Sequence, residues 1–199
     1  MIKQIILSPG HGANTPGKRS PDERLLEWEF NRKLVKRIAE GLDEAGISNY
    51  ILLDMGATDV TLAGRVARAN SFGKNCLYIS IHGNAAGNGK NWMKARGWSI
   101  YTTKGYTKSD PIAEIFIKKA EEILPYVGCN VRKYSSKKYE GDWEENFYVL
   151  RNTVMPAVLT ENLFYDNLED VAVMMSEDGL EALAKIHVEA IKEIIGKDF

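Results

Sequence analysis

Short apolar runs alternate with amphipathic stretches along the whole chain, and this alternation constrains the fold more than any other feature of the sequence. Short, mostly apolar runs are typical of buried strands, and strands that alternate with helices are typical of a mostly parallel sheet. We therefore predict one α/β domain over residues 1–199, with a twisted, mostly parallel sheet of about six strands and helices on both faces. The predicted strands are residues 2–7, 49–53, 76–81, 98–103 and 156–161.

Helical periodicity accounts for much of the chain between these runs. In residues 25–46, Phe30, Leu34 and Ile38 share one helical face, and Gly46 is placed to end the helix. Further helices are predicted over residues 62–72, 110–126 and 179–195. Two polar stretches that contain glycine fit neither pattern, and we predict loops there, at residues 84–97 and 133–146.

The composition excludes several classes of protein. A chain of 199 residues with 44% hydrophobic and 27% charged residues is expected to bury a core and not to be disordered. The formal net charge of -1 argues against a nucleic-acid binder, which would carry a basic excess. No run approaches the roughly 18 apolar residues of a membrane span. Cys76 and Cys129 lie beside apolar residues without a metal-binding spacing, so we expect free buried thiols.

Two histidines each follow a predicted strand and precede a glycine. His11 lies in SPGHGANTPG, and His82 ends the run LYISIH. Because open α/β sheets carry their sites at the carboxyl ends of strands, we expect both imidazoles at one site. Gly10 and Gly12 would let the backbone turn tightly and leave His11 unobstructed. The remaining histidine, His187, falls within the last predicted helix, where a structural or exposed role is expected.

A pair of imidazoles at a sheet edge indicates a zinc site, because catalytic zinc typically has three protein ligands and a water. The third ligand should be a carboxylate, since no cysteine lies near either histidine. Glu23, Glu27 and Glu29 all lie where the first helix begins, and periodicity alone does not separate Glu27 from Glu29.

A hydrolytic zinc site also needs a group that takes and returns protons. Glu161 ends the apolar run PAVLTE, where a carboxylate carries a burial cost that needs an explanation. It is a candidate base, and it could equally cap the helix that follows.

The two predicted loops carry Trp92, Tyr139 and Trp143. Loops that follow strands commonly line the binding site, and aromatic side chains among polar groups suit a sugar or peptide ligand. The same side chains could equally be surface-loop aromatics that pack on the core.

Several segments resemble, in order and spacing, the zinc-dependent N-acetylmuramoyl-L-alanine amidases of the Amidase_3 family. They are SPGHG, Glu27 followed by Asn31, LAGRVARAN, YISIHGNA and VLRNTVMPAVLTENLFYDN. The resemblance runs from about Ile5 to the final helix. It implies cleavage of peptidoglycan between N-acetylmuramic acid and L-alanine, by a catalytic domain without a separate cell-wall-binding domain.

The resemblance also implies roles for particular residues. It makes His11, Glu27 and His82 the ligands of one Zn²⁺ ion, and Glu161 the catalytic carboxylate. It favours Glu27 over Glu29, because the family's glutamate precedes an asparagine by four positions.

Other positions complete the predicted site. Candidate substrate contacts are Asn84, Trp143 and Arg151, and Arg151 could equally be a scaffold residue. Arg65 and Asn70 match family positions that we interpret as structural.

Two departures from the family pattern affect the surroundings of the site. Ser8 replaces the usual aspartate, so a hydrogen bond that supports His11 must come from a hydroxyl or from elsewhere. After Glu161, Asn162, Leu163 and Phe164 replace a small residue followed by Gly-Phe, which puts the shape of the adjacent pocket in doubt.

We therefore expect zinc-dependent amide hydrolysis of peptidoglycan by a monomer, without nucleic-acid partners or membrane insertion. The alternatives are a zinc carboxypeptidase or deacetylase of related fold and a non-catalytic peptidoglycan-binding module. Lys3 interrupts the first apolar run and no small-residue cleavage site follows, so we expect a chain made in the cytoplasm without a signal peptide. It would act on the cell wall or in the periplasm, as a bacteriophage lysin does.

Overall fold

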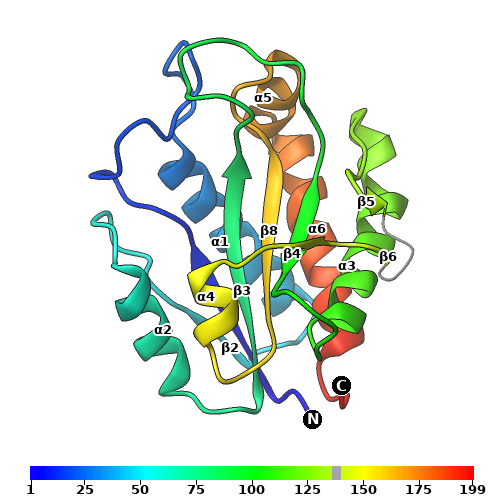
Figure 1. Ribbon diagram of the computed structural model, residues 1–199. Coiled ribbons are helices and arrows are strands. Elements are labelled where there is room, and N and C mark those ends of the chain that lie inside the picture. Colours follow the sequence, from blue (N-terminus) through cyan, green and yellow to red (C-terminus); the bar gives the residue numbers. More distant parts are fainter. Residues whose placement is uncertain (136–139) are drawn as a thin grey trace.

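The computed structural model describes residues 1–135 and 140–199, whose main sheet has six strands (Figure 1). The strand order is β2-β1-β3-β8-β4-β7. The bounds are β1 Gln4–Pro9, β2 Tyr50–Leu52, β3 Cys76–Asn84, β4 Ser99–Thr102, β7 Trp143–Glu144 and β8 Ala157–Phe164. A separate antiparallel pair consists of β5 Tyr134–Ser135 and β6 Glu140–Gly141.

The strand β8 lies in the centre of the sheet, parallel to β3 and antiparallel to β4. Its register places Glu161 opposite His82 on one side and opposite Ser99 on the other. The pairing between β3 and β8 shifts between His82 and Asn84, so a bulge lies next to these residues. The sheet is therefore mixed, and its central irregularity coincides with the candidate metal ligand on β3.

Helices cover both faces of the sheet, but unequally (Figure 1). One face is covered by four helices: α1 Glu27–Glu44, α3 Asp110–Ile123, α5 Leu168–Met175 and α6 Glu177–Ile194. Among the residues that the structure describes, the helices on the other face are α2 Leu62–Asn70 and α4 Tyr148–Asn152. A 3-10 helix, Leu124–Val127, follows α3.

The alternation of side chains along each strand separates two cores. Ile79, Ile81 and Val158 point into the larger core, which they share with α1, α3 and α6. Tyr78 and Leu159 belong to the smaller core beneath α2 and α4. Because α2 and α4 are short, the second face keeps an open region above the central strands.

The predicted α/β class, the mostly parallel sheet and the helices on both faces are confirmed. Each of the five predicted strands overlaps an observed strand, and Cys76 and Cys129 are free and buried as expected. Within the described residues, no helix is both long enough and apolar enough to cross a membrane.

Several boundaries were predicted wrongly. His82 and Glu161 do not end their strands, because pairing resumes after the bulge and continues to Asn84 and Phe164. The predicted loop at 133–146 contains β5, β6 and β7, which are too short to show a periodic pattern. The short helix α4 and the helix α5 were missed. Tyr139 lies outside the described residues.

Candidate metal centre

The corner that follows β1 presents His11, and the histidine itself makes the unusual turn. His11 has a φ of 58°, whereas neither Gly10 nor Gly12 has a positive φ. A left-handed conformation costs a non-glycine residue about 1 kcal/mol, so surrounding contacts must hold it. The expectation that the two glycines provide the turn is therefore wrong.

The two glycines instead allow close approach. A Cβ on Gly10 would lie 2.0 Å from the imidazole of His82, and a Cβ on Gly12 would lie 2.2 Å from the backbone nitrogen of Asp59. Both distances are shorter than any tolerable contact. Gly10 therefore leaves the space that the ring of His82 occupies.

Two buried arginines stabilise the corner by donating hydrogen bonds to its backbone carbonyl oxygens. Arg32 on α1 donates to the carbonyl oxygen of His11 at 2.8 Å and to that of Gly56 at 2.7 Å. Arg65 on α2 donates to the carbonyl oxygen of Pro9 at 2.7 Å and pairs with Asp59 at 2.9 Å. These charge-assisted bonds offset the strain at His11.

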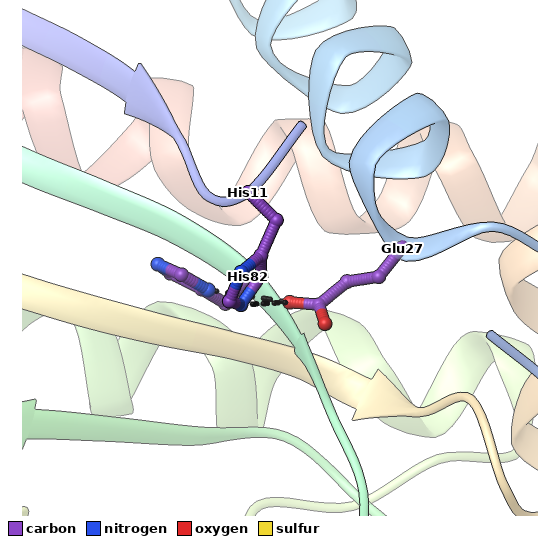
Figure 2. A group of neighbouring side chains, drawn as sticks. All are labelled: His11, Glu27 and His82. Carbon is purple, nitrogen blue, oxygen red and sulfur yellow. Dashed lines mark hydrogen bonds and ion pairs between the residues drawn. The ribbon is translucent and has the colours of Figure 1, made fainter. Parts of the chain in front are cut away.

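Glu27 begins α1, and its side chain is only 1% exposed. Its Oε1 lies 3.5 Å from Nε2 of His11 and 3.2 Å from Nδ1 of His82 (Figure 2). Its Oε2 is buried without a hydrogen-bond partner, 4.0 Å from the Nζ of Lys18. Asn31, one helical turn later, donates to Oε1 at 3.4 Å. A buried carboxylate that lacks sufficient partners fits a metal ligand better than a structural residue.

The imidazole of His82 is positioned by its own strand. Its Nε2 lies 3.1 Å from the Oγ of Ser80, two residues earlier on the same strand face, and its Nδ1 faces Glu27. The rings of His11 and His82 meet edge to face, with centroids 5.1 Å apart. A hydroxyl on one ring nitrogen selects the tautomer and leaves the other nitrogen free for a metal.

These three side chains come from three separate elements and converge on one point (Figure 2). One ligand atom from each of His11, Glu27 and His82 lies within 4.8 Å of the others. Burial lowers the pKa of His11 to about 4, so the imidazole is neutral, as a metal ligand must be. Two imidazoles and one carboxylate form a donor set that fits a zinc ion.

Glu161 lies beside the three candidate ligands, on the same face of the sheet. With His11 and His82 it lines a cavity of about 680 Å³ that opens between the start of α2 and α4, and Glu27 lies behind the two imidazoles. The Oε2 of Glu161 is buried without a hydrogen-bond partner. Burial first, and then the negative charge of Glu27, raise the pKa of Glu161 well above its usual value. Such a carboxyl group holds a proton more readily than an ordinary glutamate does.

The cavity is lined by side chains of two chemical kinds. Polar and charged groups include Lys18 and Asp59, and Asp59 accepts from Thr15 and pairs with Arg65. Apolar side chains come from α4, the residue before it and β8, and also from Val60 and Leu62 at the start of α2. They include Phe147, Tyr148, Val149 and Leu159.

The structure places the other predicted residues outside this cavity. Asn84 is half-buried and its Oδ1 accepts from the backbone nitrogen of Ala85. Trp143 lies on β7, and Arg151 is exposed on α4 with its guanidinium 5.5 Å from the ring of Tyr148. Glu29 is exposed on α1.

His187 has a structural role. It is fully buried on α6, where it contacts the hydroxyl of Thr160 at 3.0 Å and the carbonyl oxygen of Leu183 at 2.8 Å. Arg65 is buried beneath the corner, and Asn70 bonds the backbone of residues 152 and 154. The structural interpretation of these two family positions agrees with their contacts.

Both sequence departures now have a physical description. Ser8 accepts from Arg65 at 3.2 Å, and the carbonyl oxygen of His11 is held by Arg32 instead. Asn162 is buried, accepts from Nε1 of Trp98 at 2.9 Å and donates to the carbonyl oxygen of His82 at 3.0 Å. Asn162 therefore pins the bulge behind the site and does not line the cavity.

Sequence reasoning missed several supporting residues. Ser80 shares a strand face with His82, and the two-residue period could have revealed it. Lys18 and Arg32 gave no such signal. Lys18 approaches Glu27 across an irregular segment without periodicity, and Arg32 bonds backbone oxygens of residues more than 20 positions away.

An open α/β sheet that gathers two imidazoles and two buried carboxylates beside a cavity is typical of a metal-dependent hydrolase. Residues 5–193 match the family described as N-acetylmuramoyl-L-alanine amidase, Amidase_3. The chain belongs to this family. It is a hydrolase that cleaves the amide bond between N-acetylmuramic acid and L-alanine in peptidoglycan.

Individual relatives agree with this assignment. The chain is 30% identical over 196 residues to the endolysin of Bacillus phage SPP1, an alignment that covers 98% of this chain and 67% of that protein. It is 30% identical over 191 residues to the N-acetylmuramoyl-L-alanine amidase CwlM of Bacillus licheniformis, covering 96% and 68% of the two chains. The catalytic domain of the amidase CwlV from Bacillus (Paenibacillus) polymyxa superimposes with a TM-score of 0.79 at 25% identity, covering 96% and 97%.

Proposed function

We propose that this amidase uses one Zn²⁺ ion held by His11, Glu27 and His82, with Glu161 as the group that transfers protons. The observation that carries the proposal is the convergence of three ligand atoms within 4.8 Å of one another, beside the cavity that His11, His82 and Glu161 line. Two imidazoles and one carboxylate are a usual set for catalytic zinc and leave room for a water and the substrate. When bound, zinc would polarise the scissile carbonyl and lower the pKa of a water molecule.

The chain's own acid and base work is assigned to Glu161. It receives the proton that the attacking water loses and then donates it to the amine nitrogen of the departing L-alanine. Its raised pKa supports this role, because burial and the charge of Glu27 make the carboxyl group hold a proton more readily than an ordinary glutamate. No other carboxylate among the described residues lines this cavity except Asp59, which pairs with Arg65.

The residues around the ligands preserve this geometry. Ser80 orients the imidazole of His82, and Arg32 holds the carbonyl oxygen of His11. Lys18 places a positive charge 4.0 Å from Glu27, at the border of the cavity. This charge favours the ionised form of Glu27, which a metal ligand requires.

Substrate contacts extend beyond the cavity. Asn84 follows His82 on β3 and Trp143 lies on β7, and we keep both as candidate contacts. Arg151 stacks its guanidinium on Tyr148, which lines the cavity, and this contact favours a scaffold role. The chain would act at the cell wall as a monomer.

Metal content and product analysis test the proposal together. The purified protein should contain one zinc ion per chain and should release stem peptides with an N-terminal alanine from peptidoglycan, as detected by mass spectrometry. His82→Ala should lose both zinc and activity. His187→Gln is the matched control, because it removes a histidine that lies outside the cavity, and it should retain zinc.

Two results would contradict the proposal. Release of a C-terminal D-alanine in place of stem peptides would indicate a carboxypeptidase. A His82→Ala protein that binds zinc as tightly as the unchanged chain would remove His82 from the ligand set.

A further inference from the structure

Four aromatic side chains form a continuous row that begins at the cavity, and we name it the aromatic row. From the cavity outward, it consists of Phe147, Tyr101, Trp143 and Tyr134. Successive ring centroids are 5.4, 6.2 and 5.2 Å apart. Phe147 is also part of the cavity wall, so the row and the cavity form one surface.

The register of the sheet places this row on the face that carries the site. Tyr101 lies opposite Leu159, which lines the cavity, and it pairs with Trp143 on β7. The segment that contains β7 crosses β4 on its way to α4 (Figure 1). After burial, the charge of Glu161 is the largest influence that raises the pKa of Tyr101. The row therefore starts near the carboxylate that we assign to proton transfer.

The ends of the row are exposed to solvent, and the ring of Trp143 is held by a hydrogen bond. Phe147 is 36% exposed and Tyr134 is 48% exposed, and the two rings between them are half-buried. The Nε1 of Trp143 donates to the carbonyl oxygen of Arg132 at 2.9 Å. Because this hydrogen bond already fixes the orientation of the indole, the side chain loses little conformational entropy when a ligand binds.

Charged and aromatic side chains around the cavity suit different parts of the substrate. Lys18 and Asp59 line the cavity and provide charges of both signs, whereas the row offers ring faces, with the guanidinium of Arg132 5.7 Å from the ring of Trp143. The glycan of peptidoglycan is uncharged, and its sugar rings have C–H faces that pack on aromatic side chains, whereas the stem peptide carries ionised groups. The ionised groups of the peptide therefore suit Lys18 and Asp59, and the C–H faces of the sugars suit the ring faces of the row.

We propose that the aromatic row is the subsite for the glycan strand, on the muramyl side of the scissile bond. The inference rests on the proposed function, because the cavity must hold the scissile amide. The sugar that bears the scissile bond lies at the cavity, and the next sugars of the strand lie over Tyr101 and Trp143. Trp143 then gives the enzyme a preference for long glycan strands over isolated muropeptides.

Two substrates with the same scissile bond test this subsite. One is a single N-acetylmuramic acid that carries a stem peptide, and the other is a purified glycan strand of several disaccharides with the same peptide. In Trp143→Ala, kcat/KM for the strand should fall about tenfold more than kcat/KM for the single-sugar substrate, mainly through KM. This factor corresponds to about 1.4 kcal/mol. Trp143→Phe keeps an aromatic ring, so its ratio of kcat/KM for the strand to kcat/KM for the single-sugar substrate should fall by less than about threefold.

Tyr126→Ala is the matched control, because Tyr126 is 89% exposed in the 3-10 helix and does not belong to the row. It should leave both substrates unaffected. Equal losses on both substrates in Trp143→Ala would overturn the subsite and leave the proposed function intact. A larger loss on the single-sugar substrate would assign the row to the peptide and also overturn it. Failure of the unchanged enzyme to cleave either substrate would contradict the proposed function itself.

Discussion

The two faces of the sheet use the same strands for different purposes. On β8, Thr160 points into the larger core and meets His187, whereas its neighbour Glu161 points into the cavity. Within residues 1–135 and 140–199, four helices cover the first face and two short helices cover the second. The open site is therefore a consequence of incomplete helical coverage on one side of a central strand, where Glu161 is the one half-buried residue of β8.

Two histidines show what this difference means for chemistry. Burial lowers the pKa of both His11 and His187 to about 4. His187 is sealed between Thr160 and Leu183, whereas His11 lines a cavity and faces Glu27. A lowered histidine pKa therefore does not identify a metal site by itself. His11 is distinguished from His187 because it lines a cavity and has an acidic side chain beside it.

The largest expected effect concerns the open face. Glu161→Gln keeps the shape of the side chain but removes its ability to accept and return a proton, so kcat should fall by about 10²- to 10⁴-fold. Zinc content and the melting temperature should stay close to those of the unchanged protein. Glu122→Gln, an exposed residue of α3, serves as the control. An active Glu161→Gln enzyme would show that proton transfer is carried by another group.

A second prediction concerns the covered face and the pH dependence of stability. The pKa of His187 is about 4 in the folded chain and 6.5 in the unfolded chain, so the unfolded chain binds the proton first as the pH falls. The free energy of unfolding should therefore decrease between pH 6.5 and 4, by up to about 3 kcal/mol from this group, and not further below pH 4.

Urea unfolding of the unchanged protein and of His187→Gln at pH 6.5, 5 and 4 isolates this contribution. As the pH falls, the free energy of unfolding of the unchanged protein should decrease more than that of His187→Gln. A difference that is constant with pH would mean that His187 is accessible to solvent, and the contrast between the two faces would be lost.

The smallest of the three expected effects tests the close approach at the corner. Gly10→Ala would place a Cβ 2.0 Å from the imidazole of His82 and should displace that ring. Zinc affinity should fall about 10- to 100-fold, the usual range for changes that disturb the orientation of a ligand. Gly56→Ala is the control, because a Cβ there meets no atom within 4 Å. Competition with a chelator of known affinity measures the difference.

The sequence predicted the parts of this molecule that repeat along the chain. Apolar runs and helical spacing are local, so the main strands and the four longer helices were predictable. Glu27 and Glu29 could not be separated by periodicity, and burial separates them, since Glu29 is exposed and Glu27 is 1% exposed. The two-residue strand β7 was missed because its pairing partner on β4 lies about 40 residues away in sequence.

The contacts that hold the site were predictable only in part. The left-handed conformation of His11 depends on Arg32 and Arg65, whose side chains reach the corner from two different helices. The strand-end positions of His82 and Glu161 were predicted wrongly, because the bulge that extends both strands is pinned by Asn162 from within the sheet. Tertiary contacts of this kind leave no local pattern.

The central position of β8 also sets the order in which the site is completed during synthesis. His11, Glu27 and His82 all emerge early, whereas β8 is inserted between β3 and β4 only after nearly the whole sheet has been made. A growing chain can therefore gather its metal-binding side chains long before it possesses Glu161. Under the roles proposed for these residues, the ability to cut cell wall appears only when the last strand of the sheet is in place.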